Sequence, residues 1–72
     1  MTYHIGVVMN AGKHIVVKTD SEAVFKSTLE ALEQKDTTLE LEQGGMCVKI
    51  RTPNIAKIVT YQGEDFNILD FL

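Results

Sequence analysis

The side chains best suited to metal binding or proton transfer are the two histidines, His4 and His14. Both lie in segments whose apolar residues alternate with the period of a β-strand. If these segments pair around a turn at 10–12, both imidazoles leave the same outer face, but four residues apart. That separation is about 13 Å at roughly 3.3 Å per residue, too far for one metal ion to bridge. We therefore expect two strand-surface histidines and no metal site.

The nucleophile candidates are Cys47 and two serines, Ser21 and Ser27. Lys49 lies near Cys47 and could lower the pKa of its thiol, but no general base or oxyanion pocket is recognisable. The serines lack a Gly-x-Ser-x-Gly turn and are expected to cap a helix and to lie on its exposed side. Gly44-Gly45 is too short to cradle a phosphate. Four carboxylates are expected on solvated surface: Glu30, Glu33, Glu40 and Glu42. We therefore expect no catalytic residue, no cofactor and no enzyme.

Length and composition favour a single small α+β domain covering residues 1–72. The chain has 72 residues, 44% of them hydrophobic, and a net charge of −3. A domain this small rarely gains more than a few kcal/mol from its core, and one cysteine cannot form an intramolecular disulfide. Oligomerisation is therefore the expected support. The absence of a basic leader, of a membrane-length apolar run and of paired cysteines predicts a cytoplasmic protein with no membrane contact.

Two hairpins are predicted from the alternation of apolar residues. A type I turn at 10–12 with Gly12 in the left-handed region would join strands 2–9 and 13–19. It would place three pairs opposite each other: Val7 with Ile15, Ile5 with Val17, and Tyr3 with Thr19. A type I′ turn at Gly44-Gly45 would join strands 37–43 and 46–52. It would pair Gln43 with Met46, Leu41 with Val48, Leu39 with Ile50, and Glu40 with Lys49.

A helix is predicted between the hairpins, beginning at a capping box formed by Thr19 and Glu22. Six residues share its apolar stripe at helical spacing: Val24, Phe25, Thr28, Leu29, Ala31 and Leu32. The opposite side is polar. We expect this helix to lie on the sheet with the stripe inward.

The last strand and the tail carry more apolar side chains than one small core needs. The fifth strand, 55–62, follows Pro53 and is apolar on both faces, with Ile55, Val59 and Tyr61 assigned to the outer one. The tail, 64–72, either covers this sheet or binds another chain, and monomers rarely leave such surface bare. The predicted protein-binding residues are Val59, Tyr61, Phe66, Ile68, Leu69, Phe71 and Leu72.

A basic stripe gives an alternative. It consists of outward-facing Lys18, Lys49, Arg51 and Lys57 and could bind nucleic acid. The net negative charge of the chain and the lack of aromatic residues interspersed with these four for base stacking argue against nucleic-acid binding.

The sequence therefore predicts an α+β fold of about five antiparallel strands in the order β-β-α-β-β-β, packed on one helix as an open sheet or a small barrel. The first functional hypothesis is a non-enzymatic interaction module, an inhibitor or adaptor of the type that phages and mobile elements encode, acting as a homo-oligomer. The second is a nucleic-acid-binding regulator. A small enzyme or ligand-binding protein completed across an oligomer interface is the third.

Overall fold

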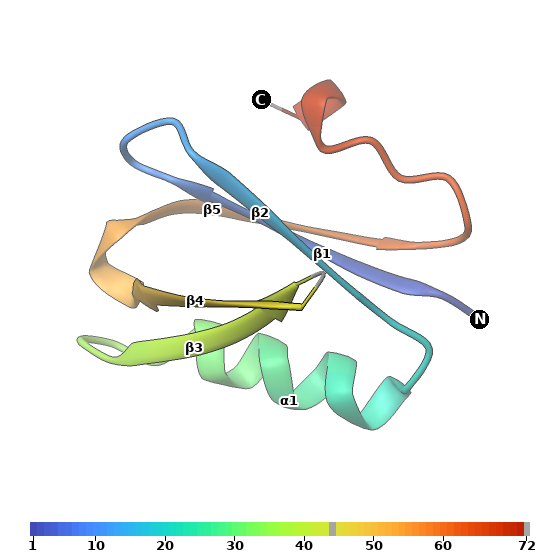
Figure 1. Ribbon diagram of the computed structural model, residues 1–72, viewed down its shortest axis with the longest axis horizontal. Helices are drawn as coiled ribbons and strands as arrows, with labels where there is room; N and C mark the ends of the chain where they lie inside the picture. Colours follow the sequence, from blue (N-terminus) through green and yellow to red (C-terminus); the bar gives the residue numbers. More distant parts are fainter. Residues whose placement is uncertain (44, 72) are drawn as a thin grey trace.

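A computed structural model describes residues 1–43 and 45–71, with the side chain of Gln43 excluded. The strands are β1 (Tyr3–Met9), β2 (His14–Thr19), β3 (Thr38–Gln43), β4 (Met46–Arg51) and β5 (Ile55–Gln62). The α-helix is α1 (Glu22–Leu32), and the short 3₁₀ turns are η1 (Thr52–Asn54) and η2 (Ile68–Phe71). The predicted α+β class and element order are confirmed (Figure 1).

The five antiparallel strands form two sheets rather than one. Sheet A has the order β2-β1-β5, and sheet B consists of β3 and β4. Among the described strands neither sheet closes on itself, so the fold is not a barrel. Sheet B and α1 lie on one side of sheet A, and the C-terminal tail lies on the other (Figure 1).

The first hairpin has the predicted register. Val7 lies opposite Ile15, Ile5 opposite Val17, and Tyr3 opposite Thr19. The Gly12 amide donates to the Met9 carbonyl over 2.9 Å, and Gly12 has a φ of 90°. A left-handed glycine after a type I turn allows a three-residue connection and keeps the apolar pairs on one face.

The second hairpin also has the predicted register, including Glu40 opposite Lys49 and Leu41 opposite Val48. Gly45 has a φ of 80°, as one position of a type I′ turn requires. The conformation predicted for Gly44 lies outside the described residues. Alternating apolar and polar residues thus determine which face of sheet B turns inward.

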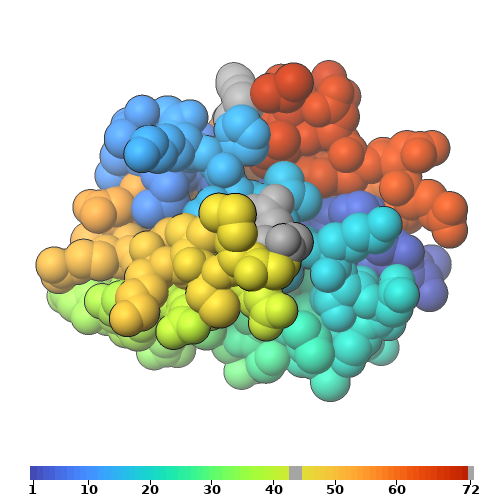
Figure 2. Space-filling view, in the orientation of Figure 1, coloured from blue at the N-terminus to red at the C-terminus, as the bar shows by residue number. Residues whose placement is uncertain are grey.

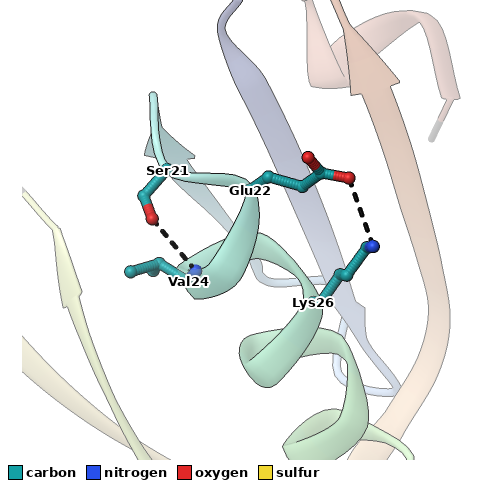
Figure 3. A network of polar contacts seen from close by, with 4 residues as sticks. All are labelled: Ser21, Glu22, Val24 and Lys26. Carbon is teal, nitrogen blue, oxygen red and sulfur yellow. Dashed lines mark hydrogen bonds and ion pairs between the residues drawn. The ribbon is translucent and has the colours of Figure 1, made fainter.

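The helix begins later than the predicted capping box. Its N-cap is Ser21, whose Oγ accepts a hydrogen bond from the Val24 amide over 3.3 Å (Figure 3). The Thr19 hydroxyl instead accepts from the Ser21 amide, and Glu22 pairs with Lys26 at 3.2 Å. The predicted cap at Thr19 was therefore wrong, because that residue still pairs with Tyr3 as the last residue of β2.

The core lies between the inner face of sheet A, α1 and sheet B. It contains Ile5, Val7, Ile15, Phe25, Leu32, Leu41 and Ile50. Tyr3 stacks on Phe25 with ring centroids 4.8 Å apart. Val24, predicted to be on the buried stripe, is 46% exposed, since it lies at the first turn beyond the edge of this contact. The other side of the helix faces water as expected.

A β-bulge in β5 places Ile55 on the face opposite to the one predicted. Val8 pairs with Lys57, but the next residue, Met9, pairs with Ile55, so Ala56 has no opposite residue. An extra residue reverses the alternation of side chains beyond it. The sequence predicted Ile55 on the outer face, and that prediction was wrong. Ile55 packs against the core.

Candidate binding surfaces

The C-terminal tail folds back over the outer face of sheet A. Phe66 stacks on His4 with ring centroids 5.4 Å apart, and Ile68 is buried. Ile68 reaches the central strand where Gly6 has no side chain, and a Cβ at Gly6 would overlap the Ile68 Cδ1 atom. The tail thus covers its own sheet, the first of the two arrangements considered from the sequence.

His4 is buried under this tail and is not a strand-surface residue. It is 5% exposed, and its Nε2 lies 2.9 Å from the Gly63 carbonyl oxygen. His14 is exposed at the far end of the hairpin, opposite Val8. Among the described residues no three His, Cys, Asp or Glu side chains are placed to share a metal ion. Through its contacts with Phe66 and the Gly63 carbonyl, His4 anchors the tail.

Part of the tail, together with Tyr61 of β5, remains exposed to solvent. Leu69 is 64% exposed, Phe71 43% and Tyr61 39%. Tyr61 and Phe71 each stack on Phe66, with both centroid distances 5.7 Å. These four residues, Tyr61, Phe66, Leu69 and Phe71, are called the tail patch below. In Figure 2 the tail, coloured orange-red to red, lies along the upper right margin of the molecule.

The other predicted protein-binding residues are not equally available. Val59 is half-buried and Ile68, a residue of the tail, is buried, since both lie where the tail meets sheet A. Leu72 lies outside the described residues. Among the described residues, the predicted set therefore separates into buried or half-buried residues at the contact between tail and sheet and exposed residues on β5 and the tail.

A second surface is a cleft of about 630 Å³ between the first hairpin turn and β4. Its apolar floor consists of Met9, Ile15, Val48 and Ile50, and its basic rim of Lys13, His14, Lys49 and Arg51. Asn10, Ala11 and Asn54 complete the lining. No acidic side chain lines it among the described residues. We call it the basic cleft.

One wall of the basic cleft is held by hydrogen bonds. The Asn10 amide donates to the Asn54 carbonyl over 2.7 Å, and the Met9 amide donates to the Lys13 carbonyl over 2.7 Å. The turn of the first hairpin is thus tied to η1, which follows β4 directly. This brings Lys13 and Arg51 to the same cleft, although the two are far apart in the sequence.

The predicted basic stripe is divided between two surfaces. Lys49 and Arg51 line the basic cleft. Lys18 and Lys57 instead lie on the outer face of sheet A, opposite His4 and Val8 respectively. Sequence reasoning missed Lys13, whose only signal was its place beside a predicted turn.

Cys47 is exposed, and its surroundings oppose nucleophilic chemistry. A hydrogen bond to the Glu40 carboxylate, desolvation, and the negative charges of Glu40 and Glu42 raise the pKa of its thiol. The Lys49 effect considered from the sequence does not prevail. A raised pKa keeps the sulfur protonated near neutral pH, where the thiolate is the reactive form.

No family model, curated protein or solved structure matches this chain. Among the described residues no helix is long and apolar enough to cross a membrane. Function must therefore be argued from the tail patch and the basic cleft.

Proposed function

We propose that this protein is a small cytoplasmic protein-binding module, an inhibitor or adaptor without catalytic activity. The observation that carries this proposal is the tail patch, where Tyr61 and Phe71 stack on Phe66 and, like Leu69, remain exposed. Aromatic residues are enriched at protein interfaces because they bury much area at little cost in conformational entropy. The tail thus has two roles: Ile68 and Phe66 seat it, and its neighbours meet a partner.

The first partner we propose is a second copy of the chain. A domain of 72 residues has a small core and benefits from apolar surface buried between copies. β5 is an edge strand of sheet A, so its outer backbone groups are available for pairing. Tyr61 lies on β5, which makes the tail patch continuous with that edge. A symmetric contact would bury both copies of the patch.

The test is the oligomeric state. At micromolar concentration we expect a dimer or larger species by light scattering behind a sizing column. Changing Tyr61→Asp and Phe71→Asp together should yield a monomer that is less stable than the parent, because association and folding are linked. A matched control, Val24→Asp with Met46→Asp, adds the same charge at exposed apolar positions on α1 and sheet B.

Two results would contradict self-association through the tail patch. A parent that remains monomeric over a hundredfold concentration range would exclude self-association. A dimer that survives the Tyr61 and Phe71 changes, or dissociates equally in the control, would move the contact elsewhere, most directly to an unpaired sheet edge.

Nucleic acid remains the alternative ligand, with weaker support. Lys49 and Arg51 share the basic cleft with Lys13, but Lys18 and Lys57 lie on another surface. No Phe, Tyr or Trp side chain lines the cleft among the described residues, whereas single-stranded nucleic acid is usually held by base stacking. A mobility shift that weakens steeply with salt would favour this alternative.

A further inference from the structure

The basic cleft runs along a free strand edge. Four consecutive residues of β4, from Val48 to Arg51, line it, and no described residue of β3 does. β4 pairs with β3 alone among the described strands. The cleft must therefore follow the edge of β4 that faces away from β3. Exposed edges of this kind can accept an additional strand through their backbone groups.

The direction of the backbone groups follows from the ladder. In an antiparallel pair, hydrogen-bonded and non-hydrogen-bonded residue pairs alternate. The Thr52 amide donates to the Thr37 carbonyl over 2.8 Å, which fixes the phase. Hydrogen-bonded pairs recur at every second residue, so the backbone N–H and C=O groups of Ile50 and Val48 also point toward β3. The N–H and C=O groups of Lys49 and Arg51 therefore face the open edge.

The two kinds of lining match the two faces of an added strand. Successive side chains of a strand point to opposite faces. On one face, an incoming strand would meet the apolar floor with Met9 and Ile15. On the other, it would lie beside Lys49 and Arg51, with Lys13 on the opposite rim. The complementary sequence alternates apolar with acidic residues.

The protein already contains such a strand on the opposite edge of β4. In β3, Leu39 lies opposite Ile50, Leu41 opposite Val48, and Glu40 opposite Lys49. β4 thus pairs with an alternating Leu-Glu sequence on one side and has a basic, apolar-floored cleft on the other. Because opposite charges across a ladder are favourable, the same pattern suits the open edge.

We propose that the basic cleft binds an extended segment of a partner protein, with alternating acidic and apolar residues, as an added strand on β4. Four residues of β4 correspond to about 10 Å at roughly 3.3 Å per residue, so the bound segment has about four to six residues. This site is separate from the tail patch. The Tyr61→Asp and Phe71→Asp variant should therefore keep it.

The probe is a capped, fluorescent peptide with the sequence of β3, Thr-Leu-Glu-Leu-Glu-Gln. We expect saturable binding below about 1 mM by fluorescence anisotropy. The same peptide with lysine in place of both glutamates should not bind. Lys13→Glu should weaken binding about fivefold, while Lys18→Glu, the same change on the outer face of sheet A, should not. Neither lysine lies in the β3–β4 ladder, so both variants keep sheet B.

Backbone measurements distinguish strand addition from simple attraction of charges. Peptide binding should slow hydrogen exchange at the Lys49 and Arg51 amides, which face the open edge. Two peptides N-methylated on alternate residues should differ, because only one carries its methyl groups toward β4. Equal binding of both methylated peptides, or unchanged exchange at Lys49 and Arg51, would overturn strand addition.

Two further outcomes would also reject the proposal. One is no peptide binding at 1 mM to a protein with native circular dichroism. The other is a single-stranded oligonucleotide that binds more tightly than the peptide and is released by Lys13→Glu, which would assign the cleft to nucleic acid. Loss of self-association without loss of peptide binding would refer only to the tail patch.

Discussion

Gly6 lies in the central strand of sheet A, and its replacement by alanine tests how the tail is seated. A glycine inside a strand normally costs roughly 0.5–1 kcal/mol relative to alanine, so the change would ordinarily stabilise the fold. Here the new Cβ would overlap Ile68 Cδ1 and lie 3.3 Å from Phe66 Cζ. The sign of the effect therefore reports whether the tail lies on this strand.

Two costs bound the expected loss of stability in Gly6→Ala, the cost of overpacking and the cost of releasing the tail. Overpacking a buried contact costs about 1–3 kcal/mol. The loss is limited by release of the tail, which forfeits about 1.5–3 kcal/mol for Ile68. After the intrinsic gain of alanine, we expect Gly6→Ala to lower the free energy of unfolding by about 1–2 kcal/mol. This corresponds to a decrease in Tm of roughly 4–8 °C for each kcal/mol in a domain of this size.

A double-mutant cycle separates this contact from other effects. Ile68→Val removes the Cδ1 atom that the new Cβ would meet, at a cost of about 0.5–1.5 kcal/mol. In that background Gly6→Ala should cost little, because the methyl group enters the space that Cδ1 has left. Urea unfolding followed by circular dichroism at one fixed protein concentration measures all four variants. A stabilising Gly6→Ala, or an equal cost in both backgrounds, would refute the seating of the tail on β1.

Three other changes test local features. Gly45→Val should lower the urea midpoint markedly, because a β-branched residue resists the φ of 80° found there; an unchanged midpoint would place the turn elsewhere. Ser21→Ala should cost about 1 kcal/mol of stability by removing the cap on the Val24 amide, whereas Ser27→Ala should cost less. Glu40→Gln should lower the pKa of the Cys47 thiol, so that alkylation by iodoacetamide accelerates at pH 8 relative to the parent; identical rate profiles against pH would show that Glu40 does not control the thiol.

The hairpins were predictable because their determinants are local. Turn length and apolar parity determine the register, so Val7 opposite Ile15 and Leu41 opposite Val48 follow from adjacent sequence. Ile55 was assigned to the wrong face because a single unpaired residue, Ala56, reverses the alternation, and nothing in the local pattern marks it.

The division into two sheets and the basic cleft depend on longer-range packing. Lys13 and Arg51 line the same cleft, beside the hydrogen bond that ties the first hairpin turn to Asn54. The sequence identified an apolar outer face and an apolar tail, but not that His4 and Gly6 provide the contacts that join them. The alternation of residues along a strand predicts which face each side chain occupies. It does not predict which other segment covers that face.

Dividing five strands between two sheets leaves four edge strands, β2 and β5 in sheet A and β3 and β4 in sheet B. Charge makes these edges unequal. Two β4 edges placed side by side would bring Lys49 and Arg51 of one copy against the same residues of another, and like charges opposite each other destabilise a ladder. The basic cleft therefore opposes self-association there while favouring an acidic strand. The self-association that we propose uses a different surface, β5 and the tail patch, where Tyr61, Leu69 and Phe71 are exposed. If both proposals hold, one small fold keeps its copies together at one surface and accepts a different partner at the other.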